Sequence, residues 1–233
     1  MATIDQLEAT GDSFVPDRLM DVRARTRRAV LSIADKIEVG MTEEDATRMA
    51  RDVLTGMGMR RGWHRTIVRF GPNTTKDFSE RSEPGVVLGE RDIYYVDIGP
   101  IYQGYEGDGG DTFVVGDDPE HERARRDVHT IWGRVRQHWL DEHATGRELY
   151  DRAGVEAERL GWRLNLDVSG HRLSDFPHAA HYGGSIAELP MMLRPDRWVL
   201  EIAIIHPDRP FGAFYEDLLL DDQSVSPFAL SPS

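Results

Sequence analysis

Two stretches of this chain repeat one pattern, and the repeat narrows the choice of fold. In the first stretch, residues 40–42 (Gly-Met-Thr) precede a helical segment that ends at Gly58. In the second, residues 145–147 (Thr-Gly-Arg) precede a helical segment that ends at Gly161. A helix comes before each segment and a strand follows it. The similarity predicts an internal duplication of one helix-helix-strand unit.

The spacing of apolar residues defines the elements of both units. Helical periodicity predicts helices over residues 16–37, 42–57, 120–140 and 145–160. Apolar, β-prone runs predict strands over 66–70, 93–98, 199–205 and 214–220, and residues 104–115 return antiparallel to 93–98. No stretch has the composition of an interdomain linker. We therefore expect one α+β domain over residues 1–233, in which residues 1–15 form an N-terminal extension.

Composition excludes several functions. The chain has 28 Lys and Arg against 41 Asp and Glu, a formal net charge of -13, which repels a phosphate backbone. Nucleic acid is therefore not an expected partner. There is no cysteine, so any metal must be held by carboxylates and imidazoles. Residues 1–14 contain no apolar run, which predicts a cytoplasmic protein with no membrane partner.

Four acids and a histidine suggest a metal site. Asp97 ends an apolar strand and Asp108 lies eleven residues later on the returning arm, so a hairpin brings both carboxylates to one point. Glu201 lies inside an apolar run, where burial is costly unless a cation compensates it or the strand is at an edge, with the side chain in water. With Glu216 and His171, these residues match the ligands of a carboxylate-bridged pair of Mn²⁺, Fe²⁺, Co²⁺ or Zn²⁺ ions.

The motifs around these residues resemble one enzyme family, that of creatinase, aminopeptidase P, prolidase and methionine aminopeptidase. The resemblance covers residues 20–222. It rests on residues 96–99, 102–108, 112–113, 170–171, 178 and 214–218. It implies a pita-bread fold, with pseudo-twofold duplicated helix-helix-strand units around a curved antiparallel sheet. It also implies two divalent metal ions held by Asp97, Asp108, His171, Glu201 and Glu216.

The sequence also departs from the family pattern. A histidine usual after the Gly-Pro-Asn turn at residues 71–73 is missing, and residues 74–78 read Thr-Thr-Lys-Asp-Phe. His64 is a candidate replacement or else a solvated loop residue. Changes around Asp77, Arg172 and Ile202 are expected to alter positions that face the substrate. The two glutamates are only fifteen residues apart, which predicts a trimmed hairpin.

Three functions remain open at this stage. The first is a dinuclear metal-dependent hydrolase, aminopeptidase-like, that activates water for attack on an amide or C–N bond of a small peptide. The second is a non-peptidase enzyme of a specialised pathway, a C–N hydrolase, lyase or redox enzyme acting on a small molecule. A metal-free binding module is the third, and the retention of all five ligands argues against it. The catalytic candidates are His178, Glu201 and His64, and the expected substrate-binding residues are Phe78, His178, His181 and Tyr182.

Other residues have structural interpretations. Arg23, Arg25, Arg27 and Arg28 are expected on a solvated helix face, and His121, His129, His138 and His143 on exposed helix surface. Trp132 and Trp139, at helical spacing, are expected in the core or in the interface of a homodimer.

Overall fold

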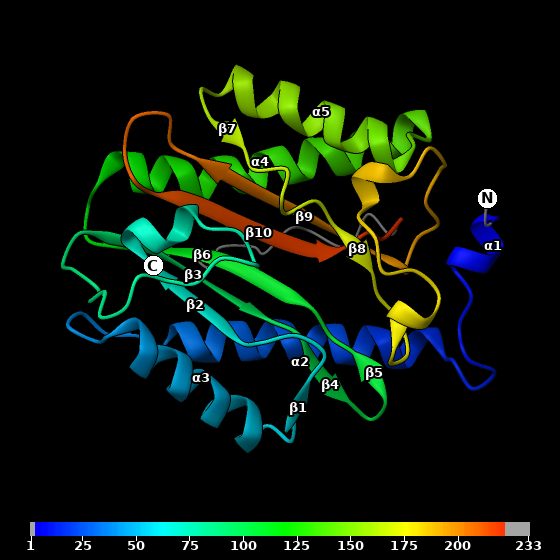
Figure 1. Ribbon diagram of the computed structural model, residues 1–233, viewed down its shortest axis with the longest axis horizontal. Coiled ribbons are helices and arrows are strands. Elements are labelled where there is room, and N and C mark those ends of the chain that lie inside the picture. The colour runs from blue at the N-terminus through cyan, green and yellow to red at the C-terminus, as the bar shows by residue number, and fades with distance from the viewer. Residues whose placement is uncertain (1–2, 222–233) are drawn as a thin grey trace.

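The computed structural model describes residues 3–221 of the 233-residue chain (Figure 1). Its helices are α1 (Ile4–Leu7), α2 (Pro16–Ala34), α3 (Glu43–Gly56), α4 (Pro119–Glu142) and α5 (Gly146–Arg159), with 3-10 helices η1 (Gly71–Thr75), η2 (His178–Ala180) and η3 (Ile186–Glu188). Its strands are β1 (Arg61–Gly62), β2 (Ile67–Phe70), β3 (Asp92–Ile98), β4 (Pro100–Tyr102), β5 (Tyr105–Glu106), β6 (Gly109–Val115), β7 (Arg163–Leu164), β8 (His171–Arg172), β9 (Trp198–Ile205) and β10 (Gly212–Leu218).

The main sheet shows the predicted duplication in its strand order. The order is β2-β3-β6-β10-β9-β7, with β8 paired to β9, and the named pairings are antiparallel. The first half of the chain supplies β2, β3 and β6, and the second half supplies their counterparts in reverse order. The short strands β1, β4 and β5 form a separate sheet. The predicted α+β fold with duplicated units is therefore confirmed.

The second helix of each unit begins in the same way. Thr42 accepts a hydrogen bond from the backbone N–H of Asp45, and Thr145 accepts one from Glu148. Each hydroxyl satisfies an N–H that has no partner within the helix. Beyond the helices, Gly58 and Gly161 have φ angles of +82° and +80°, a left-handed conformation that glycine adopts without strain. These residues fix where α3 and α5 begin and end.

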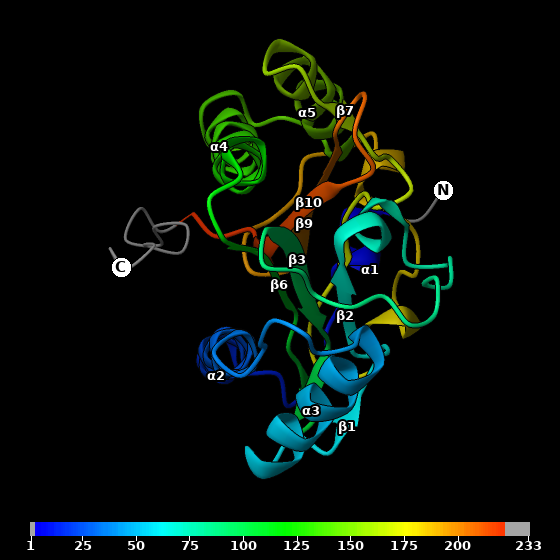
Figure 2. The same cartoon turned by 90° about the vertical axis from the view of Figure 1, so that its left-hand side faces the viewer.

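One face of the sheet is covered by helices. Figure 2 shows α2 and α4 on the same side of the strands, one beside each half of the sheet. Side chains alternate along a strand, so Leu200 and Ile202 of β9 point into the core on this side, while Glu201 points to the other. Trp132 and Trp139 of α4 are in this core, and their indole N–H groups donate to the carbonyls of Leu200 and Leu193.

Several polar residues are more buried than the sequence analysis expected. Arg23 donates to both carboxylate oxygens of buried Asp217, at 2.6 and 2.5 Å. His121 is buried, and Nε2 of His129 lies 2.7 Å from Oδ1 of Asp111. The prediction of an exposed surface was wrong for these residues. Arg23 and His129 turn toward buried acids of the sheet, whereas the ring of His121 packs against Phe211. In residues 3–221, no helix has the length and apolar character to cross a membrane.

We predict that Thr145→Ala lowers the free energy of unfolding by about 1 kcal/mol, because an N–H at the start of α5 loses its acceptor. Urea denaturation of the two proteins measures the difference. Thr130→Ala is the matched control, since its hydroxyl bonds to the Arg126 carbonyl inside α4 and alanine favours a helix interior. Equal losses in both variants would contradict the capping role.

Candidate metal centre

The register of four strands places three carboxylates in one row. Asp97 on β3 pairs with Gly110 on β6, and Gly110 pairs with Glu216 on β10. Glu216 in turn pairs with Glu201 on β9. Directly opposed residues project from the same face of a sheet, so the three side chains share the face away from α2 and α4. The pairing also explains the short spacing of the glutamates, because they oppose each other in one tight hairpin.

Gly110 leaves the centre of this row open. A Cβ atom at that position would lie 2.3 Å from Cε1 of Phe214 and 2.9 Å from Oε1 of Glu216. Any other residue would therefore displace a ring of the cavity or a carboxylate of the row. The glycine leaves a space between Asp97 and Glu216.

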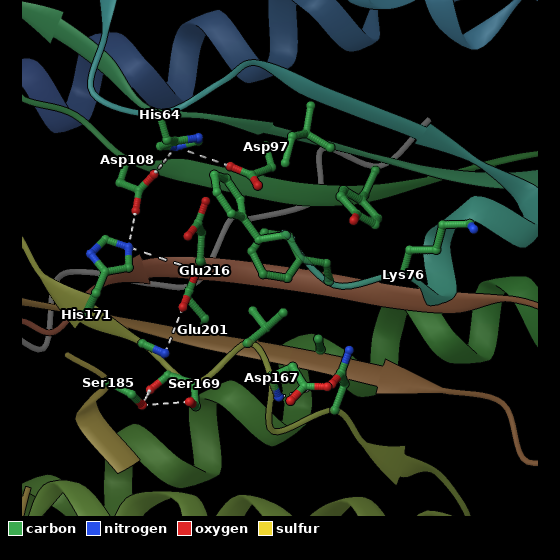
Figure 3. Close-up of a pocket in the computed structure, with 18 of the residues that line it drawn as sticks. His64, Lys76, Asp97, Asp108, Asp167, Ser169, His171, Ser185, Glu201 and Glu216 are labelled. Carbon is green, nitrogen blue, oxygen red and sulfur yellow. Dashed lines mark hydrogen bonds and ion pairs between the residues drawn. The ribbon is translucent and has the colours of Figure 1, made fainter. Parts of the chain in front are cut away.

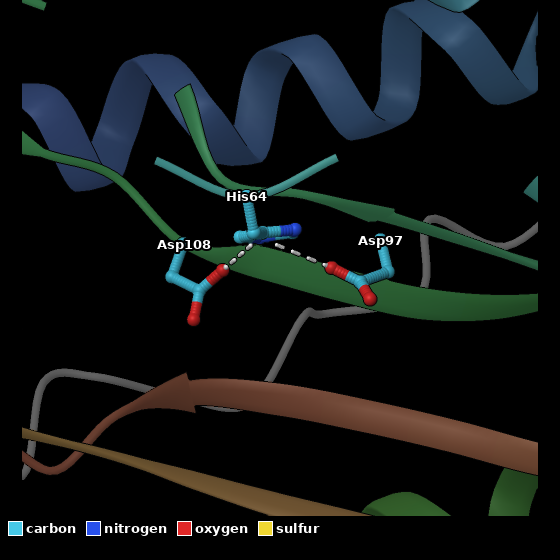
Figure 4. A group of neighbouring side chains, drawn as sticks. All are labelled: His64, Asp97 and Asp108. Atoms are coloured by element: carbon cyan, nitrogen blue, oxygen red, sulfur yellow. Dashed lines mark hydrogen bonds and ion pairs between the residues drawn. The ribbon is translucent and has the colours of Figure 1, made fainter. Parts of the chain in front are cut away.

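Asp108 lies next to this space, between two imidazoles (Figure 3). Its Oδ1 atom is 3.1 Å from Nε2 of His64, and its Oδ2 atom is 2.8 Å from Nε2 of His171. His64 also approaches Asp97, with 3.5 Å between Nε2 and Oδ1 (Figure 4). The side chain of His64 is only 7% exposed, so the alternative of a solvated loop histidine was wrong.

All five predicted ligands line one cavity of about 370 Å³. His64, Phe78 and His178 line the same cavity. The two carboxylate oxygens of Glu201 have different neighbours. Oε2 accepts a hydrogen bond of 2.7 Å from the N–H of Gly170, and Oε1 is 3.9 Å from Nε2 of His171. The structure thus gathers the complete predicted ligand set in one place.

Burial and the repulsion between neighbouring carboxylates shift the pKa values of the acids in the cavity. Burial raises the pKa of Asp97 to about 7 although His64 opposes the shift. Burial and the neighbouring carboxylates, Asp108 foremost, raise the pKa of Glu216 well above its usual value. For Glu201, burial is again the largest cause of a raised pKa. Burial acts the same way on Asp108, but hydrogen bonds from His171 and His64 outweigh it and lower its pKa.

These acids raise the pKa values of the imidazoles of His64 and His171. Burial alone lowers the pKa of a histidine, but Asp97 and Asp108 raise that of His64 to about 9. Burial is likewise overcome at His171, where the hydrogen bond to Asp108 and the charges of Asp108 and Glu201 raise the pKa to about 10. The cavity therefore attracts positive charge.

The donor set fits a divalent cation. His64, Asp97 and Asp108 form one triplet whose ligand atoms all lie within 4.8 Å of one another, and Asp108, His171 and Glu216 form another. Oε1 of Glu216 is buried with no hydrogen-bond partner. A buried carboxylate oxygen without a partner costs free energy, and a cation would satisfy it. Glu201 belongs to neither triplet.

Two residues near the site were missed by the sequence analysis. Buried Glu106 accepts hydrogen bonds from the backbone N–H of His178, at 3.0 Å, and from its Nδ1, at 2.7 Å. The indole of Trp63 contacts the rings of His64, His171 and His178, with centroid distances of 4.4, 4.8 and 4.9 Å. Glu106 lies two residues before Asp108, so its place in that motif was the available clue.

The expected substrate residues divide into two groups. Phe78 and His178 line the cavity, whereas His181 and Tyr182 are not among its lining residues. The hydroxyl of Tyr182 instead donates to the carbonyl of Ser185, and its ring packs against Trp198.

The altered stretch around Asp77 reaches the cavity through Lys76 and Phe78, and the prediction was wrong for Arg172 and Ile202. Arg172 is fully buried and donates to the carbonyls of Leu7 and Ala9, which ties down the N-terminal segment. Ile202 packs in the core, and Asp77 accepts hydrogen bonds from Ser79. None of the three lines the cavity.

The segment after the Gly-Pro-Asn turn is held to the sheet by hydrogen bonds from one buried arginine. Arg69 of β2 is 1% exposed, and its guanidinium donates to the carbonyls of Lys76, Asp77 and Glu80. This segment places the Phe78 ring 5.6 Å from that of His64, between ring centroids.

Fold and site together define a pita-bread protein with a carboxylate and imidazole metal centre. The chain belongs to metallopeptidase family M24, whose model matches residues 17–220. The expected family is thereby confirmed. A comparison with curated protein sequences found no match.

Solved structures show the same fold. The X-Pro aminopeptidase from Thermotoga maritima MSB8 has a TM-score of 0.72 and 19% identity, over 91% of this chain and 59% of its own. The prolidase from Pyrococcus horikoshii OT3 gives 0.69 and 19%, over 93% and 61%. A dipeptidase from Mycobacterium ulcerans gives 0.70 and 21%, over 92% and 57%. This chain thus spans about three fifths of the length of these proteins.

We predict that the metal-free chain becomes less stable as pH rises from about 5 to 9. The raised pKa values of Asp97, Glu216, His64 and His171 mean that the folded state keeps protons which the unfolded state releases. That stability is lost as pH rises through the folded values, and the lowered pKa of Asp108 opposes it only below about pH 4.

Urea titrations in the presence of a chelator measure this slope. Glu216→Gln removes one of the buried charges, so its slope should be smaller and its metal-free form more stable than the wild type at pH 8. Stability that stays level or rises with pH over this range would mean that the acids do not repel one another in the folded chain.

Proposed function

We propose that this chain is an aminopeptidase-like hydrolase that depends on two divalent cations, Mn²⁺, Fe²⁺, Co²⁺ or Zn²⁺. The observation that carries the proposal is the position of Asp108, whose carboxylate belongs to both ligand triplets. A carboxylate shared in this way is the bridge that a two-metal site requires. Family membership agrees with this chemistry.

The ligands fall on two sides of that bridge. Asp97 stands on the side of Oδ1 of Asp108, and His171 on the side of Oδ2. Glu216, which lies in the row on β10, would serve as a second bridging ligand. Glu201 would be a ligand of the cation on the His171 side. When bound, the cations supply Lewis-acid activation of water and stabilise negative charge on the substrate.

Two side chains would move protons. Glu201 keeps Oε2 on the Gly170 N–H, which leaves Oε1 to accept a proton from the attacking water. His178 holds its Nδ1–H on the carboxylate of Glu106, and in its doubly protonated form its Nε2–H would donate to the carbonyl of a bound substrate. Glu106 acts through His178 and is a positioning residue.

A second candidate function is that of a C–N hydrolase, lyase or redox enzyme acting on a small non-peptide molecule. Phe78, which is 47% exposed, presents a phenyl ring to the cavity in the segment where family peptidases carry a histidine. A phenyl ring cannot donate a hydrogen bond to a peptide carbonyl. A cavity of about 370 Å³ suits a compact molecule as well as a dipeptide.

We predict about two divalent cations per chain under metal-replete conditions, and loss of the pair in Asp108→Ala, because that change removes the shared ligand. Elemental analysis after gel filtration counts the ions. Asp117→Ala, which removes an exposed acid paired with Arg91, is the control and should retain both. A metal-replete wild type without bound cations would end the proposal.

Chelation of the wild type should lower its melting temperature, because a ligand that binds only the folded state stabilises it. Glu201→Gln should keep part of the metal and lose most activity. An unchanged melting curve after verified metal removal would argue that these acids do not converge on the cation.

We predict weak cleavage of common peptides, with kcat/KM below roughly 10⁴ M⁻¹s⁻¹. One missing donor at the reacting group costs ~10² to 10³ in rate. Dipeptides, X-Pro peptides and methionyl peptides, each assayed with all four cations, give the measurement. Phe78→His should raise cleavage of at least one peptide by about tenfold or more, and efficient cleavage by the wild type would return it to the ordinary aminopeptidases.

A further inference from the structure

Two histidines, one from each half of the chain, approach Asp108 in the same manner. His64 presents Nε2 to Oδ1 at 3.1 Å, and His171 presents Nε2 to Oδ2 at 2.8 Å. Each is followed by an arginine, and each places Nδ1 2.8 Å from the carbonyl oxygen of that arginine, Arg65 or Arg172. The two imidazoles therefore repeat one local geometry on opposite sides of one carboxylate.

The carbonyl contact defines which nitrogen is available. A carbonyl oxygen only accepts hydrogen bonds, so Nδ1 of His64 carries a hydrogen. The lone pair of the neutral ring is then on Nε2, the atom that points between Asp97 and Asp108. Metal-binding histidines generally hold their other N–H on a carbonyl or carboxylate in this way.

The distances around Nε2 of His64 suit coordination. Atoms bound to one ion at ~2.1 Å with tetrahedral or octahedral angles lie ~3.0 to 3.4 Å apart. Nε2 of His64 is 3.1 Å from Oδ1 of Asp108, within that range, and 3.5 Å from Oδ1 of Asp97, just beyond it. All three atoms belong to one compact triplet (Figure 4).

Packing holds the ring in this place. A Cβ atom on Gly99 would lie 1.9 Å from Cδ2 and 2.1 Å from Nε2 of His64, so the ring occupies space that only a glycine leaves. Trp63 packs on it at 4.4 Å and Phe78 at 5.6 Å, between ring centroids. The imidazole is thus fixed before any ion arrives, as a ligand must be to bind without loss of side-chain entropy.

We propose that His64 is a sixth protein ligand, which binds the cation held by Asp97 and Asp108, so that each of the two cation positions has one imidazole. The inference rests on the proposed two-metal site and assigns His64 to the metal in place of the substrate. It predicts a preference for ions that favour imidazole, such as Co²⁺ and Zn²⁺, over Mn²⁺.

Titration of the metal-free protein with Co²⁺ alone, followed by calorimetry and visible absorption, tests the assignment. His64→Gln should weaken one of the two Co²⁺ sites by at least about tenfold, since loss of a partner one shell further out already costs 10- to 100-fold. It should also alter the cobalt spectrum, and Mn²⁺ binding should weaken less. His138→Gln, on α4 and outside the cavity lining, is the matched control.

X-ray absorption of the Co²⁺-loaded wild type counts the imidazole ligands without any variant. The assignment can therefore be tested even if the His64→Gln protein does not fold. We expect two imidazoles per two cobalt ions, whereas one would overturn the inference. Unchanged affinity and spectrum in His64→Gln with a lower kcat/KM would make His64 a substrate donor and overturn it equally. A wild type that binds no Co²⁺ would instead refute the proposed function itself.

Discussion

Four carboxylates that meet in one buried cavity repel one another, and the surrounding residues reduce that repulsion. The strand register sets Asp97, Glu216 and Glu201 in a row, and Asp108 joins them beside the gap left by Gly110. Two imidazoles face Asp108 and supply the positive charge that the described chain offers there. An oxygen of Glu216 still has no partner, which is the remaining need that a cation would meet.

The sheet separates this polar chemistry from the core by alternation alone. On β9, Leu200 and Ile202 pack with α4 while Glu201 between them faces the cavity. Because a shift of one residue would exchange the two faces, the apolar side chains that fill the core also hold the ligands in register. The duplicated helix-helix-strand units supply this arrangement twice, so both halves of the centre are supported by a helix behind the sheet.

Much of the fold and the metal centre could be predicted because the determinants are local. Periodicity and the caps Thr42 and Thr145 locate the helices, and the five ligands lie in or beside strands with recognisable patterns. The rest depends on contacts between distant segments. His64 reaches Asp108 because β1 pairs with β4 and brings the loop over Gly99, and no periodicity encodes that pairing. Arg172 turns inward to carbonyls of the N-terminal segment more than 160 residues away in sequence, as its bonds to Leu7 and Ala9 show.

Arg69 holds one segment of the cavity wall in place through bonds that do not depend on the side chains of that segment. It holds the segment around Phe78 through the carbonyls of Lys76, Asp77 and Glu80, and a carbonyl is the same whatever side chain the residue bears. Natural selection can therefore exchange residues of this segment while its path over the metal centre is kept. The ligand residues in the sheet and the side chains of this loop can therefore change separately.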